Sequence, residues 1–199
     1  GYDAEKEAVV AYGLIAIVQV TVTVLLVLVL GLLLGVVWEA LTVCFSVSIY
    51  RRYSGGAHAD DANFCTLVTV VYCSLAALAS RWLAAAYGPA PMLAAIVLVY
   101  AFVFLATYRY APVDSPNKPV TSKKKIKRVR TASFIIVSVY FALQLCLFLF
   151  KIPAQAYRSL GISLLLGVSW QAFTLTPLGA ILLHKLNDLP KYLGKEVSK

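Results

Sequence analysis

Residues 8–50 read AVVAYGLIAIVQVTVTVLLVLVLGLLLGVVWEALTVCFSVSIY. This run is apolar almost without a break. As a single helix it would be about 65 Å long, twice the ~30 Å hydrocarbon core of a bilayer. Gly31 and Gly35 mark a place where the chain can turn sharply. The run therefore predicts two membrane-spanning helices, near residues 9–30 and 35–52, joined by a tight turn.

The composition of the whole chain supports the same class. Of the 199 residues, 61% are hydrophobic and 14% are charged, whereas soluble domains carry about a quarter charged residues. This balance indicates an integral membrane protein without a separate soluble domain. The net charge is +9, but positive charge in a membrane protein first reports its topology, so we expect no nucleic-acid partner.

Four more apolar stretches follow, and we expect spans near residues 63–83, 92–110, 132–150 and 159–184, the last with a kink at Pro177. The predicted fold is thus one all-α polytopic membrane domain, residues 1–199, with six transmembrane helices. Six spans put both termini on one side, where fifteen of the eighteen Lys and Arg residues would then lie. That excess identifies the side as cytoplasmic.

A polar segment, RRYSGGAHADDANFC, interrupts the apolar runs at residues 51–65. Its His58 and Cys65 are the minimum set for nucleophilic catalysis, because an imidazole takes the thiol proton and the thiolate attacks a carbonyl. In one uniform helix these side chains would share a face but lie about 10 Å apart, too far for proton transfer. Gly55 and Gly56 allow a sharp turn that folds His58 back over the next helix.

The acidic residues of this segment leave two alternatives open. Asp60 is a possible orienter of His58 by its position, and either Asp60 or Asp61 is suited to cap the following helix. A metal site built from His58, Asp60, Asp61 and Cys65 is the other alternative, although adjacent aspartates point to different faces. We expect no metal and no cofactor.

The chain has four cysteines, Cys44, Cys65, Cys73 and Cys146, without paired spacing. All but Cys65 lie inside apolar runs, where cysteine usually serves as a small hydrophobic residue. We therefore expect no disulfides. If Cys65 lies at the cytoplasmic surface, the reducing compartment keeps it a free thiol.

Three motifs together resemble the accessory gene regulator B (AgrB) family. They are Arg51-Arg52 followed by Gly55-Gly56-Ala57-His58-Ala59 and then Cys65; Tyr12-Gly13-Leu14 in the first helix; and Tyr110-Ala111-Pro112 with Asn117-Lys118-Pro119 in the long polar stretch. The resemblance extends in order over nearly the whole chain. The glycine, histidine and cysteine core carries most of its specificity.

The resemblance implies a bacterial cell-membrane cysteine endopeptidase that processes the quorum-sensing propeptide AgrD. The family's catalytic histidine falls on His58 and its nucleophilic cysteine on Cys65, with the active site facing the cytoplasm. Cleavage near the propeptide's C-terminus would leave a thioester on the enzyme. A propeptide cysteine would then displace it and close a thiolactone ring. The resemblance also implies a homodimer.

The polar stretch at residues 111–130 is expected to form a basic cytoplasmic loop. Positive side chains in such a loop attract anionic lipid headgroups, and the family's substrates suggest that they also hold the acidic tail of a propeptide. The candidate residues are Lys118, Lys123, Lys124, Lys125, Lys127, Arg128 and Arg130.

Two readings without catalysis also remain, a multi-span peptide carrier and a membrane sensor that binds peptide without cleaving it. A carrier would need ionisable groups at mid-membrane depth on several spans. The obvious polar residues there are only Gln19, Gln144 and Gln171. Glu39, an isolated carboxylate near the first turn, is expected to reach the outer membrane interface.

Overall fold

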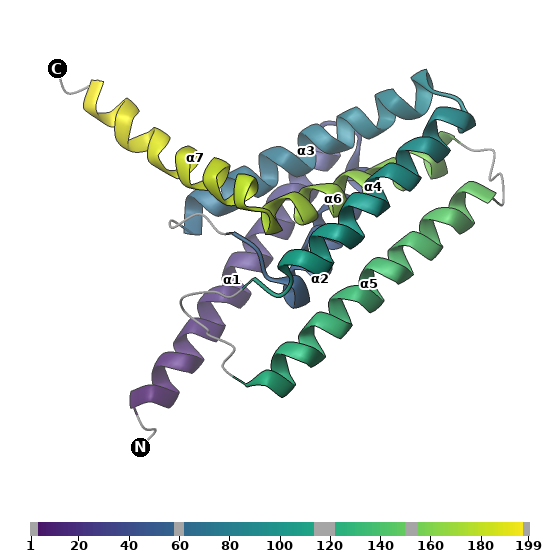
Figure 1. The fold of residues 1–199 in the computed structure, drawn as a ribbon. Coiled ribbons are helices and arrows are strands. Elements are labelled where there is room, and N and C mark those ends of the chain that lie inside the picture. The colour runs from purple at the N-terminus through teal and green to yellow at the C-terminus, as the bar shows by residue number, and fades with distance from the viewer. Residues whose placement is uncertain (1–3, 58–61, 114–121, 150–154, 197–199) are drawn as a thin grey trace.

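The computed structural model describes residues 4–57, 62–113, 122–149 and 155–196. All the elements named within these ranges are helices (Figure 1). They are α1 (Ala4–Leu33), α2 (Val37–Ser54), α3 (Ala62–Ala86), α4 (Pro89–Tyr110), α5 (Lys123–Leu149), α6 (Gln155–Leu175) and α7 (Pro177–Glu196). The prediction of an all-α protein is confirmed.

The long apolar run at the start of the chain folds back on itself as predicted. α1 ends at Leu33, and Gly35 has a φ of 68° in the turn before α2. This is the left-handed region that glycine enters without steric cost. At Gly31 an added Cβ would lie 2.9 Å from the Cα of Val37, so this glycine lets the two helices approach closely.

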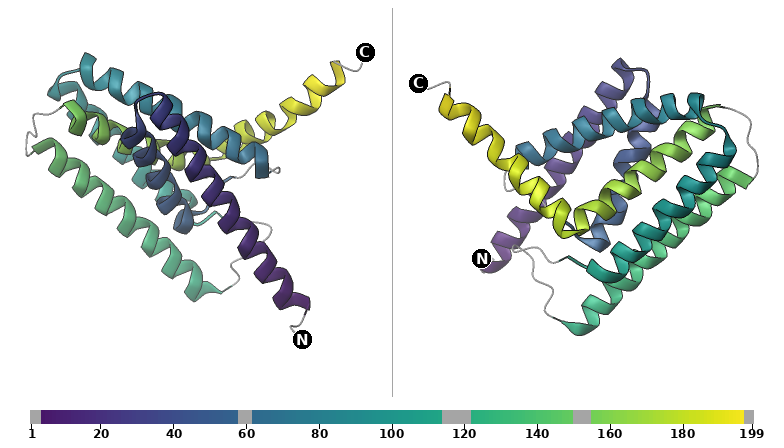
Figure 2. Two further views of the ribbon diagram at one scale, coloured as in Figure 1. Left: turned by 180° about the vertical axis from the view of Figure 1, so that it is seen from behind. Right: turned by 45° about the horizontal axis from the view of Figure 1, so that its top comes forward.

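α6 is the central helix of the bundle and packs against α2, α3, α4 and α5 (Figure 2). One buried cluster joins α2, α4, α5 and α6 and includes Tyr50, Tyr100, Val137 and Val168. The hydroxyl of Tyr50 is 2.6 Å from that of Thr107 on α4, so the buried polar atom has a partner. α1 lies at the edge, with much of its apolar surface exposed.

Four helical segments of the described chain are long and apolar enough to cross a membrane. They are Gly13–Leu33, Asn63–Ala86, Pro91–Tyr110 and Lys123–Phe148, and there are five if the bent pair α6 and α7 counts as one span. α2 does not qualify, and it carries Glu39, Arg51 and Arg52. The structure therefore supports a multi-pass membrane protein, and six spans remain a prediction.

One predicted boundary is wrong. The basic loop was expected to run to Arg130, but α5 begins at Lys123, so residues 123–130 are helical. Lysine and arginine are good helix formers, and no proline or glycine interrupts them there. Within the predicted sixth span, 159–184, the chain bends by 91° between α6 and α7, beside Pro177, and a single broken span there stays a prediction.

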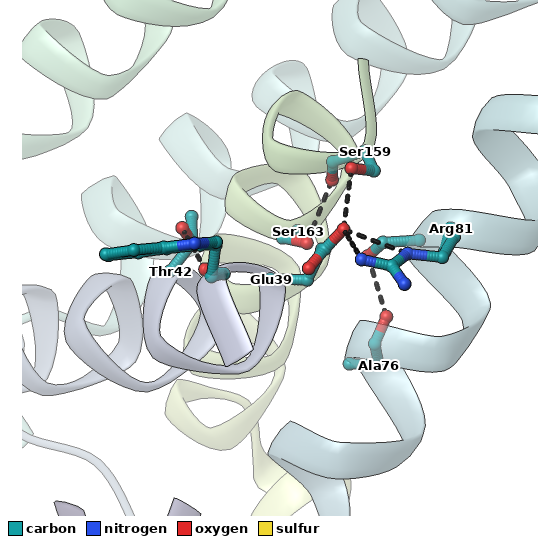
Figure 3. A network of polar contacts seen from close by, with 8 residues as sticks. Glu39, Thr42, Ala76, Arg81, Ser159 and Ser163 are labelled. Atoms are coloured by element: carbon teal, nitrogen blue, oxygen red, sulfur yellow. Dashed lines mark hydrogen bonds and ion pairs between the residues drawn. The ribbon is translucent and has the colours of Figure 1, made fainter. Parts of the chain in front are cut away.

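The expectation for Glu39 is also wrong, because its side chain is buried, with 3% exposed. Its Oε1 accepts hydrogen bonds from Arg81 Nη2 at 3.0 Å and from Ser159 Oγ at 2.9 Å (Figure 3). A buried carboxylate is costly unless it is paired and hydrogen-bonded. The network ties α2, α3 and α6 together, over sequence separations that no local pattern reveals.

The sidedness of the bundle can be tested by labelling single cysteines. Ser122, before α5, and Gly88, before α4, are both exposed and lie in connecting segments. We expect a membrane-impermeant maleimide to label Ser122→Cys only from the cytoplasmic side and Gly88→Cys only from outside, because the Lys and Arg excess lies on the side of Ser122. Labelling of Ser122→Cys from outside would rule out the predicted orientation.

Candidate functional site

The site begins where α2 ends, at residues 54–57, here called the glycine loop. The N–H of Gly55 donates to the carbonyl of Arg51 at 3.0 Å and closes the last turn of α2. Gly55 and Gly56 then have φ values of 68° and 138°, which favour glycine. Both glycines have the positive φ that the predicted turn needs, and the predicted folding of His58 back over the next helix lies outside the described residues.

The segment after α4 fixes one side of the glycine loop. The N–H of Val113 donates to the carbonyl of Ser54 at 2.9 Å, and Gly55 and Val113 form an isolated parallel bridge. A Cβ added at Gly55 would lie 2.0 Å from the carbonyl oxygen of Val113. Only glycine fits at this position, both for its φ and for its contact with Val113.

Two residues of α6, here called the clamp, hold the other side of the loop. Gln171 is fully buried, and its Nε2 donates to the carbonyl of Gly55 at 2.7 Å and to Ser54 Oγ at 3.1 Å. The carbonyl of Thr174 accepts a hydrogen bond from the N–H of Ala57 at 3.1 Å. The backbone is thus fixed on both sides up to the residue before His58.

Arg51 connects the glycine loop to the candidate nucleophile. Its Nη2 donates to the carbonyl of Ala57, and Cys65 lies within electrostatic range of its guanidinium. Cys65 is half-buried near the start of α3. A positive charge at this place attracts the negative charge that develops on a sulfur or an oxyanion during acyl transfer.

The other three thiols have different surroundings. Cys44 and Cys73 are buried and hydrogen-bonded to each other between α2 and α3. Cys146 is exposed near the end of α5. All four cysteines are free, and Cys65 is the one within electrostatic range of Arg51.

Several predicted site residues lie outside the described residues, among them His58, Asp60, Asp61 and Lys118. The pairing of His58 with Cys65 and the orienting role of Asp60 therefore stay predictions. No group of three potential metal ligands occurs within the described residues. The alternative metal site includes His58, Asp60 and Asp61, so it stays untested.

The candidate basic residues of α5 occupy its first turns. Five of them are exposed, namely Lys123, Lys124, Lys125, Lys127 and Arg128. Arg130 is half-buried, donates through Nη2 to the carbonyl of Tyr108 and lies 5.2 Å from the centre of that ring. Arg130 therefore joins α5 to α4, while the five exposed side chains are free to meet a partner.

Reasoning from the sequence missed the roles of Gln171 and Thr174. Both lie more than a hundred residues from the glycine loop, so no local spacing connects them. The available signal was a glutamine within an apolar run, because a buried amide needs hydrogen-bond partners. Gln171 finds these partners in the loop itself.

The structure is a bundle of apolar helices, with a polar loop, a guanidinium and a thiol at one end. These features are those of a multi-pass membrane protein with a candidate functional site at one face. The chain belongs to the accessory gene regulator B family, whose sequence model matches residues 1–175. This membership supports a part in the processing of the agr quorum-sensing propeptide. The match ends at Leu175, where α6 ends.

Individual relatives agree with the family assignment. The chain is 32% identical to an AgrB-like protein of Clostridium perfringens strain SM101, over 96% of this chain and 91% of the relative. It is 30% identical to an AgrB-like protein of Halalkalibacterium halodurans, over 93% and 83% of the two chains. No solved structure matches the chain.

Proposed function

We propose that this protein is a membrane-embedded cysteine endopeptidase that cleaves off the C-terminal part of an AgrD-like propeptide. Cys65 is the nucleophile and His58 the general base. The observation that carries the proposal is the clamped glycine loop, which is fixed by Gln171, Thr174 and Val113 up to Ala57 and is tied by Arg51 to the Cys65 side. Such fixed geometry is what a proton transfer between two side chains requires.

The chemistry follows from a thiol beside an imidazole. His58 takes the proton from Cys65 Sγ as the sulfur attacks the scissile carbonyl carbon, and the imidazolium then protonates the departing amine. The N-terminal part of the propeptide stays on Cys65 as a thioester. A cysteine thiol of the propeptide then attacks this thioester, closes a thiolactone ring and returns the thiol of Cys65.

The surroundings suit an exchange between two thiols. A thioester must reach a second thiol before water hydrolyses it, so the site must limit the access of water. The loop lies against the buried end of α6, where Gly56 is next to Leu175, which is 4% exposed. Apolar packing on this side favours ring closure over hydrolysis.

We also propose the setting of this reaction. The protein spans the bacterial cell membrane six times with its site at the cytoplasmic face, and it works as a homodimer. The exposed lysines of α5 and Arg128 bind the acidic tail of the propeptide or anionic headgroups, since these charged side chains are exposed on the surface of the helix. No nucleic acid, metal or cofactor takes part.

The test of the proposal is to trap the thioester. Wild-type protein in membranes should accumulate a covalent adduct when it receives a propeptide whose internal cysteine is replaced by alanine, because no second thiol can resolve the intermediate. Mass spectrometry should place the N-terminal part of the propeptide on Cys65, and hydroxylamine should release it. Binding without cleavage would instead favour the non-enzymatic carrier or sensor.

The role of the clamp can be tested by comparing two buried glutamines of the same chain, one in the clamp and one elsewhere. Gln171→Ala should slow formation of the acyl-enzyme about 10²-fold, the scale of loss when catalytic groups are misplaced by about 1 Å. Binding of the propeptide should change less. Gln144→Ala removes an equally buried amide from α5, away from the glycine loop. It should leave the rate of acylation close to wild type.

Single-turnover acylation and propeptide affinity would both be measured for these two variants. Thr174→Val offers a second comparison, because it keeps the main-chain carbonyl that accepts from Ala57 and loses only the hydroxyl. It should be milder than Gln171→Ala. Equal rates for Gln171→Ala and Gln144→Ala would show that the clamp does not position the site.

A further inference from the structure

The last helix leaves the bundle nearly at a right angle. The segment Pro177–Leu186 of α7 makes an angle of 91° with α6, and α7 projects away from the other helices in both views of Figure 2. α6 has 21 residues, about 30 Å at 1.5 Å per residue, which already matches the hydrocarbon core. By length and composition, α6 and the start of α7 qualify as a span only as a pair, so the right-angle bend is what separates α7 from α6. α7 also lies beyond the residues matched by the family.

The bend is built by specific contacts. Thr176 Oγ1 accepts a hydrogen bond from the N–H of Gly179 at 3.2 Å and donates to the carbonyl of Phe173 at 2.7 Å. Pro177 is the first residue of α7, a position where its missing N–H costs nothing. A Cβ on Gly179 would lie 2.1 Å from the carbonyl oxygen of Phe173. The joint is thus close-packed and fixes the direction of α7.

The first turns of α7 have an apolar side and a polar side. Leu178 and Leu182 are 70% and 40% exposed, while Leu183 is buried. At about 100° per residue these three leucines lie within one arc, and the exposed His184 lies opposite. Ile181, which is 52% exposed, extends the arc on its other side, so exposed Lys185 lies within the arc, between Ile181 and Leu178. The long stem of Lys185 can carry the ammonium group to the interface.

We propose that α7 lies in the plane of an anionic membrane surface, on the side of the bundle that carries the glycine loop. A right-angle joint at the end of a membrane-length helix places the next helix along the surface. The exposed leucines continue the apolar surface of the bundle into the lipid. Lys185 is placed to meet anionic headgroups.

This placement links the lipid surface to the candidate site. The clamp residue Thr174 lies two residues before Thr176, which holds the joint. A helix anchored in the surface therefore fixes the depth of the end of α6 that holds the glycine loop. The proposed placement of α7 is argued from the bend and from the apolar and polar sides of the helix. It does not depend on which reaction the candidate site performs.

Depth measurements on the full-length protein test the proposal. A fluorescent label would be attached to Leu182→Cys or His184→Cys, in a variant whose four native cysteines are replaced, in nanodiscs of phosphatidylcholine and phosphatidylglycerol. Quenching by a nitroxide on the lipid chains should be at least threefold stronger for position 182, and quenching by iodide stronger for position 184. Labels at the exposed Leu105 of α4 and at Ser122 give the lipid and water references.

Three results would overturn the proposal. Equal iodide quenching at positions 182 and 184 would place α7 in water. Protection of position 182 from both quenchers would mean that protein covers the apolar side, whether the bundle itself or a second copy. In nanodiscs of phosphatidylcholine alone, the difference between the two positions should shrink at low salt, and an unchanged difference would remove anionic headgroups from the proposal.

Discussion

Cys65→Ala should abolish propeptide cleavage while the protein stays folded and inserted in the membrane. The variant removes the proposed nucleophile, and such losses are on the order of 10⁶-fold or reach the detection limit. A single half-buried thiol at the start of α3 contributes little to the packing of the bundle. Cleavage would be followed by mass spectrometry of the propeptide, and folding by the thermal unfolding of the purified protein.

Companion variants separate the roles within the pair. His58→Ala should lose roughly 10²–10⁴-fold, the usual contribution of a general base. Cys65→Ser should be close to inactive, because a hydroxyl beside an ordinary imidazole is far less nucleophilic than a thiol. Cys146→Ala removes an exposed thiol from α5 and serves as the matched control, with activity near that of wild type.

The outcomes that contradict this mechanism are distinct. An active Cys65→Ala variant would remove Cys65 from the reaction. An adduct on Cys44, Cys73 or Cys146 would assign the reaction to another thiol. Cleavage without any adduct, together with inhibition by a chelator, would favour the metal alternative built on His58, Asp60 and Asp61.

Local features of the sequence predicted the helical membrane class and both glycine turns. An apolar run of twice the membrane length must fold back, and Gly35 supplies the positive φ where the run turns. The pair Gly55 and Gly56 predicted the second turn for the same reason. Such predictions succeed because each depends on residues that are neighbours in the chain.

Features that depend on tertiary contacts were missed. Glu39 looked like an interfacial carboxylate because its partners, Arg81 and Ser159, lie 42 and 120 residues away. Gln171 looked like an isolated polar residue because it bonds to Gly55, 116 residues earlier. The bend at Pro177 was predicted only as a kink within one span, since the sequence does not show that Gly179 packs against the carbonyl of Phe173.

Gly55→Ala should cause the second large loss of activity, about 10²-fold in acylation, because the glycine loop must move to admit a methyl group. The new Cβ would lie 2.0 Å from the carbonyl oxygen of Val113, a backbone atom that cannot rotate away. Alanine at a φ of 68° also costs about 1–2 kcal/mol of stability. Gly35 has the same φ but open space around it, so Gly35→Ala isolates the cost of the φ alone.

The three glycines with positive φ thus form a graded series. Gly35→Ala should lower the thermal stability and leave acylation nearly unchanged, because the α1–α2 turn does not contact the glycine loop. At Gly56 an added Cβ would meet Thr174 Oγ1 at 3.0 Å, and this side-chain atom can shift by a few tenths of an ångström, so Gly56→Ala should be intermediate. Single-turnover acylation and thermal unfolding would be measured for each variant. If Gly55→Ala retains as much activity as Gly35→Ala, the contact with Val113 does not hold the loop in its reactive position.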